Sequence, residues 1–383
     1  MAANVQGPMS GVSLGVFDMH MHPTLKSFML GKKFLKPHHP PAGFFPLTMR
    51  TDLDALLAGG VKAFFSTVYM VERDFLEDIW PLRYVRWLLP RLNHILRTPP
   101  DALVLECLDH QEAVFEKANV RRGPVIETAL SYSEMKRIMA EGKIAVLRSV
   151  EGAHHLNGRV ENVDLFFEHG VCHMIVPHLY PNEACENVDA FPDLTALRKI
   201  GCFHKRFNMD TGLTDFGCEV VDRMLEVGML VDMCHATPRC RTEILERARN
   251  HPVKRPIVMS HVGVHELAPY PMNPDPKEIH DIAETGGVIG IIAMGHWLKK
   301  PEPRDGLEAV LQTVDHLIEY GGDEVVAFGS DFDGFTGPPR DFKSPRDYAT
   351  LRTLLRVRYG EERAAKFLSG NVERALQLGW GKQ

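Results

Sequence analysis

The sequence predicts an α/β protein of the (β/α)8 TIM-barrel type, and two observations support this fold class. First, short apolar runs recur along the 383 residues, and most are followed by a polar, helix-like stretch. Runs that are apolar on both faces are typical of buried parallel strands, and their alternation with helices indicates βαβ units. Second, eight such runs fit a barrel that needs ~250 residues before insertions. A doubly wound sheet is the competing fold, but no glycine-rich nucleotide-binding loop follows any run.

The expected elements extend over most of the chain. The eight predicted strands span residues 16–19, 61–68, 144–150, 172–177, 229–233, 256–260, 287–293 and 325–329. The predicted helices span residues 52–57, 134–141, 215–227, 241–249, 276–284 and 306–320. Most of the surplus length lies between the second and third strands. We therefore expect a single barrel domain over residues 1–383, with a helical insertion at about 70–143.

The insertion carries an apolar stripe with helical spacing, interrupted by Pro81 and Pro90. Its members recur at three- and four-residue steps: Phe75, Ile79, Leu82, Val85, Leu89, Leu92 and Leu96. Three interpretations remain open: packing on the barrel flank, a subunit interface in a homodimer, or a lid over the site. A membrane surface is disfavoured because arginines interrupt the stripe without forming a basic face.

Composition excludes several classes of protein. Lys+Arg number 44 against 50 Asp+Glu, and this net charge of −6 argues against a nucleic-acid partner. No apolar run approaches the ~20 residues of a membrane span, and the first 18 residues lack the pattern of a secretory signal. The seven cysteines are scattered and never form a C-x-x-C pair. We therefore expect reduced thiols, a cytoplasmic location and no membrane partner.

Nineteen histidines make metal binding the first hypothesis, because histidine is the commonest metal ligand. Six of the eight predicted strands end on a residue able to bind metal or transfer a proton. In strand order these residues are His20 with His22, Glu151, His178, His235, His261 and Asp331. The carboxyl ends of barrel strands form one rim, where active sites of this fold lie. Residues more than 300 positions apart are thus expected to converge in one pocket.

The spacing within this set suggests individual roles. His20 and His22 alternate on a strand, so both imidazoles face one side and can reach one cation. Glu151 can bridge two ions ~3.5–4 Å apart, as two-metal hydrolases require. Asp331 is nearer its strand end than Asp333 and is the expected proton shuttle, whereas an aspartate before glycine is more often a turn residue.

The same segments also carry a family resemblance. In chain order they read DMHMHP, EGAHH, PHLYPNEACEN, GLTDFGCEVVDRMLEVGMLVDMCH, IVMSHVG, ETGGVIGI, VVAFGSDFDG and FLSGNVERAL. Together they resemble the membrane dipeptidase family (renal dipeptidase, peptidase M19) of the amidohydrolase superfamily. The resemblance covers residues 12–22 and 144–379 and is weak through 23–143. It implies a zinc-dependent barrel that hydrolyses dipeptides and related small amides.

The resemblance also implies roles for single residues. It makes His20 and His22 ligands of one zinc, His235 and His261 ligands of a second, and Glu151 the bridge. It makes His178 the contact to the substrate carbonyl and Asp331 the catalytic aspartate. Tyr180 and Asn182 follow the fourth strand, and their position makes them candidate substrate contacts.

Two positions depart from the family pattern. The family usually has aspartate at the place of His22, so the His20/His22 site is one charge more positive, which bears on its metal preference and occupancy. The family also has an arginine about eleven residues after the sixth-strand histidine to hold the dipeptide carboxylate; here Met272 stands there. Because an arginine fork is the usual grip on a free carboxylate, its absence keeps two alternatives open. One is a small amide, lactone or ester without a free carboxylate, and the other is an inactive metal-binding barrel that serves as an interaction module.

Overall fold

The computed structural model describes residues 14–78, 90–191, 199, 208–334 and 336–381. Eight parallel strands close into a barrel, because β2 pairs with β4 as well as with β1 and so joins the two ends of the sheet. The barrel strands are β1 (Val16–Met21), β2 (Val61–Val68), β4 (Ile144–Glu151), β5 (Val171–Ile175), β6 (Leu230–Asp232), β7 (Ile257–Val262), β8 (Ile289–Ile291) and β9 (Val326–Phe328). The predicted TIM barrel is confirmed.

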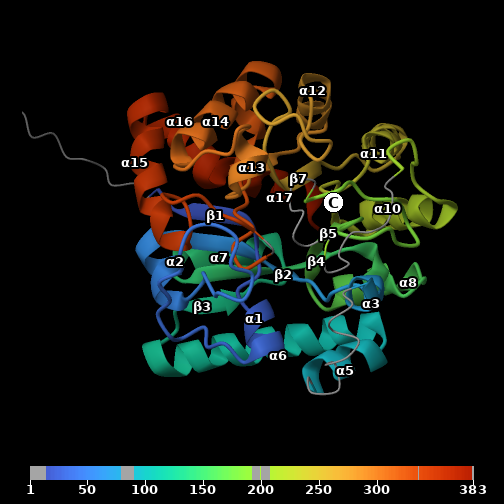
Figure 1. The fold of residues 1–383 in the computed structure, drawn as a ribbon, viewed down its shortest axis with the longest axis horizontal. Helices are drawn as coiled ribbons and strands as arrows, with labels where there is room; N and C mark the ends of the chain where they lie inside the picture. Colours follow the sequence, from blue (N-terminus) through green and yellow to red (C-terminus); the bar gives the residue numbers. More distant parts are fainter. Residues whose placement is uncertain (1–13, 79–89, 192–198, 200–207, 335, 382–383) are drawn as a thin grey trace, which may run out of the picture.

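Helices surround the barrel, with α6 along one side and α12, α14, α15 and α16 along the opposite one (Figure 1). Up to β5 the helical elements are α1 (Leu25–Leu30), α2 (Leu53–Gly59), α3 (Arg73–Asp78), α5 (Pro90–Arg97), α6 (Pro100–Arg122), α7 (Tyr132–Ala140), η2 (Ala153–Leu156) and α8 (Glu161–Glu168). After β5 they are α10 (Asp215–Val227), α11 (Pro238–Asn250), α12 (Pro276–Glu284), α13 (Gly295–Leu298), α14 (Leu307–Gly321), η3 (Asp323–Val325), η4 (Pro345–Asp347), α15 (Tyr348–Tyr359), α16 (Glu361–Ala365), η5 (Lys366–Gly370) and α17 (Asn371–Gly379).

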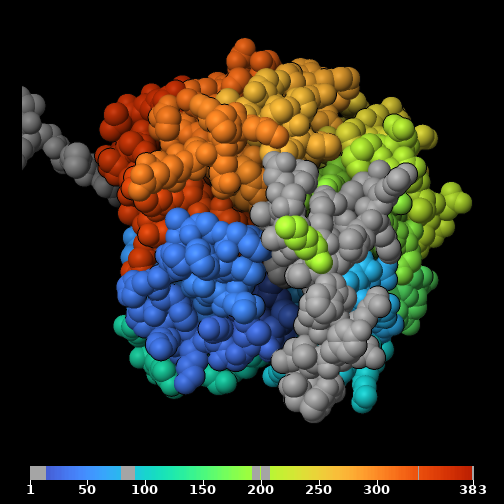
Figure 2. All heavy atoms as spheres, viewed as in Figure 1, coloured from blue at the N-terminus to red at the C-terminus, as the bar shows by residue number. Residues whose placement is uncertain are grey.

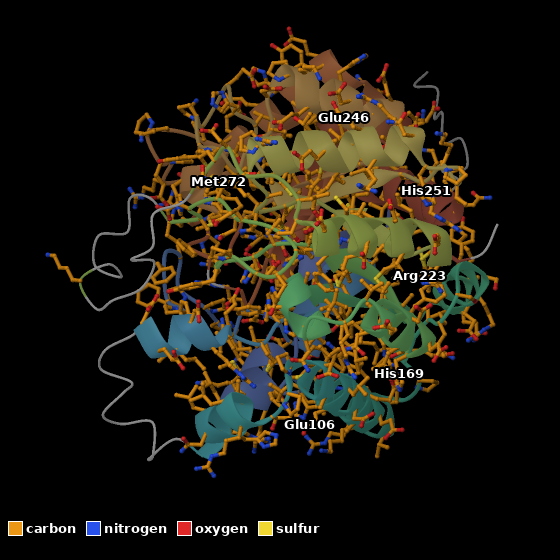
Figure 3. The ribbon with its side chains drawn as sticks, turned by 90° about the vertical axis from the view of Figure 1, so that its right-hand side faces the viewer. Glu106, His169, Arg223, Glu246, His251 and Met272 are labelled. Atoms are coloured by element: carbon orange, nitrogen blue, oxygen red, sulfur yellow. The ribbon has the colours of Figure 1, made fainter. Side chains whose placement is uncertain are left out.

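The barrel strands are buried on both faces, as their sequences predict. In β2 the side chains alternate between two apolar clusters: Ala63 and Phe65 belong to one, Phe64 and Val68 to the other. This alternation follows from the two-residue period of a strand. Salt bridges also link neighbouring helices on the surface: Arg223 of α10, labelled in Figure 3, pairs with Asp164 of α8.

The insertion between β2 and β4 is not wholly helical. It contains a ninth strand, β3 (Ile126–Thr128), which pairs with the first residues of β4. The edge of β4 is free there because β5 pairs with β4 only from Arg148 onward. β3 was not predicted, because its apolar run, Val125 and Ile126, is only two residues long.

The apolar stripe of the insertion is described only in part, because residues 79–89 lie outside the described ranges. Phe75 of α3 and Leu92 of α5 are buried, and Leu96 packs on the core. The interface and lid interpretations remain predictions. None of the helices within the described ranges is both long and apolar enough to cross a membrane.

Elements from the N-terminal and C-terminal parts of the chain pack against each other on one flank of the barrel. Blue N-terminal residues lie directly beside red C-terminal ones in Figure 2. β1 pairs with β9, and η5 packs against β1. This closure brings His20, near the start of the chain, to the backbone of Asp331, whose amide donates to the His20 carbonyl at 2.8 Å.

Candidate metal centre and active site

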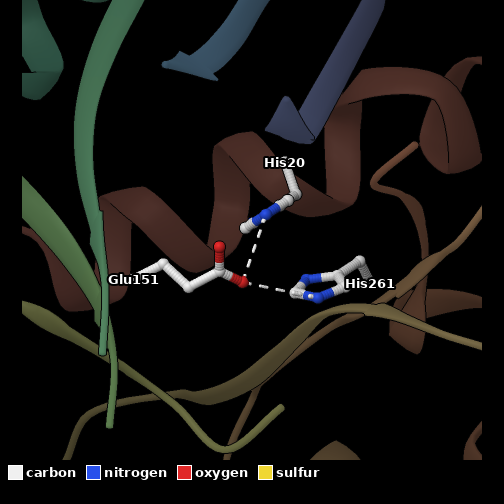
Figure 4. A group of neighbouring side chains, drawn as sticks. All are labelled: His20, Glu151 and His261. Atoms are coloured by element: carbon white, nitrogen blue, oxygen red, sulfur yellow. Dashed lines mark ion pairs between the residues drawn. The ribbon is translucent and has the colours of Figure 1, made fainter. Parts of the chain in front are cut away.

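Seven of the nine predicted site residues converge at one end of the barrel. His20, Glu151 and His261 face one another there (Figure 4), although they come from β1, β4 and β7. Two further groups able to hold a cation overlap with this one: His20, His22 and Asp331, and Glu151, His178 and His235. All these side chains except Asp331 are buried.

The imidazoles form two pairs on either side of one carboxylate. The Nε2 atoms of His20 and His22 lie 3.0 Å apart, and so do those of His235 and His261. Oε1 of Glu151 lies 3.5 Å from His20 Nε2 and 3.7 Å from His261 Nε2. Its Oε2 lies 3.4 Å from His22 Nε2. Two ligands of one tetrahedral zinc lie roughly 3.3 Å apart, so each pair has the spacing of ligands to a shared cation.

At His20, His22 and His261, outer contacts at Nδ1 leave Nε2 facing the centre of the cluster. Nδ1 of His22 donates to the carbonyl of Thr67 at 3.1 Å. Nδ1 of His261 lies 2.9 Å from the hydroxyl of Ser260, which is also 3.4 Å from Nδ1 of His20. A partner at one ring nitrogen fixes the orientation and frees the other for metal.

Burial puts these side chains in states that suit a metal. It lowers the pKa of His20, His235 and His261 well below the usual range, and neighbouring imidazoles reinforce the effect. The imidazoles are therefore neutral, as ligation requires. Burial and the neighbouring Asp331 raise the pKa of Glu151. A bound cation would stabilise the ionised form of this buried carboxylate. The donor set therefore fits a metal such as zinc.

The backbone is unusual at two of these positions. His235 has φ 64° and Asp331 has φ 55°, both in the left-handed region that favours glycine. The loop after β9 separates its two aspartates. Oδ1 of Asp331 lies 3.3 Å from His22 Nε2, whereas Asp333 is buried and accepts from Lys26 and from the amides of Arg50 and Thr51. Asp331 is therefore the aspartate of this loop that reaches the metal centre, as predicted from its strand-end position.

His178 follows β5 and lies at the edge of the cluster, with Nε2 3.5 Å from Glu151 Oε2. Its Nδ1 lies 3.2 Å from Oε1 of Glu72, a buried carboxylate that sequence reasoning missed. Tyr69 donates to the other oxygen of Glu72 at 2.6 Å. Tyr69 directly follows β2, and Glu72 lies four residues beyond it. β2 is one of the two strands without a predicted site residue, and that gap was the signal that could have pointed to them.

The cavity beside the metal centre has an apolar wall. Leu179, Phe191, Met294 and Trp297 line it together with His22, Glu151, His178, His235 and Asp331. The indole of Trp297 stacks on His261, with ring centroids 6.2 Å apart and an interplanar angle of 11°. No lysine or arginine contributes to the lining from the described part of the chain.

Three other sequence positions lie apart from this cavity. Tyr180 and Asn182 line a neighbouring pocket with His154 and Glu72. The side chain of Asn182 holds a turn, since its carbonyl accepts from the amides of Ala184 and Cys185. Substrate contact by Tyr180 and Asn182 therefore has no support from this geometry. Met272 is fully buried in the loop between β7 and α12 (Figure 3).

Comparison with known proteins agrees with this geometry. The family model described as membrane dipeptidase (peptidase family M19) matches residues 16–378. The chain belongs to this family. Among curated members, rat dipeptidase 3 is 25% identical over 236 residues, which are 61% of this chain and 45% of that protein. An uncharacterized dipeptidase of Schizosaccharomyces pombe is 26% identical over 211 residues, 55% of this chain and 46% of that protein. The match thus spans less than half of either dipeptidase.

Two solved structures share the fold over nearly the whole chain. A metallopeptidase described as dipeptidase AC has a TM-score of 0.74 at 21% identity, covering 96% of this chain and 99% of that one. A Rhodobacter sphaeroides metallopeptidase, bound to a phosphinate mimic of L-Ala-D-Ala, has a TM-score of 0.73 at 19% identity with the same coverage. These similarities support the fold alone, and the family assignment stands on the family model.

Proposed function

We propose that this protein is a zinc-dependent hydrolase that cleaves the amide bond of dipeptides or similar small amides at a two-metal centre. The observation that carries the proposal is the arrangement of two histidine pairs around Glu151, beside an aspartate and a fifth histidine. Membership of the membrane dipeptidase family supports the same reaction class.

The donor atoms favour zinc and allow two ions. Imidazole nitrogens with a carboxylate oxygen are ligands typical of zinc, and none of the cluster residues is a cysteine. In this proposal His20 and His22 would hold one ion and His235 and His261 the other, with Glu151 as the carboxylate ligand between the two pairs. When bound, zinc lowers the pKa of a coordinated water and polarises a carbonyl oxygen.

Two side chains then act on the substrate: one transfers the proton, and the other stabilises the negative charge that develops. Asp331 takes the proton of the attacking water at its carboxylate, which faces the cavity, and returns it to the leaving nitrogen. His178 turns Nε2 toward the same space, and once Nε2 is protonated in addition to Nδ1, the imidazolium paired with Glu72 stabilises the oxyanion as it develops. The apolar wall of Phe191, Met294 and Trp297 excludes water and strengthens both interactions.

Asp331→Asn tests this assignment. The amide keeps the shape of the side chain but cannot accept the proton, so we expect zinc content to stay at the wild-type level and kcat to fall by roughly 10²–10⁴-fold. Metal analysis and dipeptide turnover on the same preparation measure the two effects. Wild-type turnover in this variant would exclude Asp331 as the proton carrier.

A second candidate substrate class is a small amide, lactone or ester without a free carboxylate. It is favoured by Met272 at the place of the family arginine and by the lack of a cationic side chain among the described residues that line the cavity. A panel of dipeptides with free and amidated C-termini, together with simple lactones, separates the two classes. Preference for the free C-terminus would reject this candidate and support the dipeptidase assignment.

A further inference from the structure

Glu72 forms a buried junction between the end of β2 and the loop after β5. Oε1 lies 3.2 Å from His178 Nδ1 and accepts from the amide of Leu179 at 3.2 Å, while Oε2 accepts from the hydroxyl of Tyr69 at 2.6 Å. Glu72, Tyr69 and His178 are each less than 10% exposed. Three donors therefore converge on one carboxylate that has little contact with water.

These contacts define which nitrogen of His178 carries a proton. An ionised carboxylate only accepts hydrogen bonds, and Glu72 already receives two from Tyr69 and Leu179. Nδ1 of His178 must then be the N–H donor. The opposite nitrogen, Nε2, is left facing Glu151 at 3.5 Å.

The surroundings also fix the plane of the imidazole ring. The phenol of Tyr69 packs edge-on against His178, with ring centroids 4.2 Å apart and an interplanar angle of 64°. The ring of His235 also packs against that of His178, with a centroid distance of 4.8 Å. A ring flip would remove the donor from Glu72 and leave a buried carboxylate oxygen poorly satisfied, which is costly.

We propose that Glu72 is a positioning residue that holds His178 with a proton on Nδ1 and directs its Nε2 at the reacting atoms. The functional consequence rests on the proposed hydrolase activity, in which His178 stabilises the oxyanion. Hydrogen-bonded partners of this kind typically contribute 10- to 100-fold to metal affinity or activity.

The first test measures the protonation of the two ring nitrogens of His178 directly. In zinc-loaded protein with ¹⁵N-labelled histidine, ¹⁵N shifts distinguish a protonated ring nitrogen from a bare one, and comparison with His178→Ala identifies the His178 signals. We expect a protonated Nδ1 in the wild type, its loss in Glu72→Ala, and its retention in Glu72→Gln, because the side-chain amide oxygen can still accept. An unchanged His178 signal in Glu72→Ala would overturn the proposal whatever the substrate is.

The second test is a double-mutant cycle on kcat. We expect Glu72→Ala to lower kcat by roughly 10- to 100-fold with little change in KM and in zinc content, and Glu72→Gln to recover part of the loss. In the His178→Ala background, Glu72→Ala should have no further effect, since it acts through that ring. An equal loss in both backgrounds would contradict the proposal.

The two tests separate this inference from the proposed function. Full activity of His178→Ala would reject the catalytic role of His178, while the ¹⁵N experiment would still report on Glu72. Asp101→Ala is a matched control: this carboxylate of α6 binds Asn157, Arg159 and Asn162 in the same region and does not touch His178. Its kcat should equal that of the wild type.

Discussion

At the scale of single residues, His22 is the position of the metal centre at which the sequence resemblance predicts a departure from the family pattern. Its Nδ1 is committed to the carbonyl of Thr67, and its Nε2 lies within 3.5 Å of His20, Glu151 and Asp331. The imidazole of His22 is therefore buried and in contact with the other residues of the cluster.

We expect His22→Ala to lose close to one of two zinc ions, because one member of the His20/His22 pair is gone. His22→Asp should retain both, since a carboxylate is also a zinc ligand. Metal analysis after dialysis measures the difference, and His265→Ala, at an exposed position, serves as the control. Equal zinc content in His22→Ala and the control would contradict the ligand assignment.

At the scale of elements, the centre depends on how closely β7 approaches β8 and β9. A Cβ atom at Gly290 of β8 or at Gly329, the residue after β9, would collide with the carbonyl oxygen of Ser260 in β7. The hydroxyl of Ser260 holds the Nδ1 atoms of His261 and His20. Glycine at these two positions therefore lets three strands pack while Ser260 orients two ligands.

Gly290→Ala should lower the free energy of unfolding by about 1–3 kcal/mol, because the new methyl group overpacks the barrel. Gly370→Ala is the matched control: this exposed glycine has helical φ and ψ of −56° and −40°, and the nearest atom to its Cβ is 3.7 Å away. There alanine should be neutral or stabilising. Urea unfolding measures both, and equal stability of the two variants would refute the close-packing interpretation.

At the scale of the whole molecule, barrel closure gathers ligands from β1, β4 and β7 and from the loop after β6. A cation that binds this set binds the folded chain far better than the unfolded one. Metal should therefore stabilise the entire barrel and not only the site.

Removal of metal with a chelator should accordingly lower Tm, and added zinc should restore it. Free zinc at roughly 100 times Kd contributes about 2.7 kcal/mol per site. Differential scanning calorimetry at several zinc concentrations measures the shift. A Tm that does not respond to chelator or zinc would count against a metal centre in this barrel.

The sequence was sufficient for the barrel and for the convergence of the cluster residues, because strand ends in this fold share one rim. His20, Glu151 and His261 lie on strands, so their positions followed from the apolar runs alone. Contacts made by loops were less predictable. Glu72 lies four residues beyond β2, and its direction depends on Tyr69 and on the loop after β5.

Tyr180 and Asn182 illustrate the same limit. Their distance along the chain from β5 is compatible with the cavity, but the turn that Asn182 stabilises carries them into the neighbouring pocket. Short-range periodicity contains no information on such a turn. The three residues of β3 were missed for a related reason, since their pairing depends on where β5 begins.

The left-handed backbone at His235 and Asp331 has an evolutionary consequence. A residue with a Cβ atom pays roughly 1–2 kcal/mol in this conformation, a cost that glycine avoids. Selection for thermal stability alone would therefore favour glycine at both positions, and only selection for chemistry opposes it. Among relatives of this chain, glycine at the place of His235 or Asp331 should mark lineages that have abandoned catalysis while keeping the barrel.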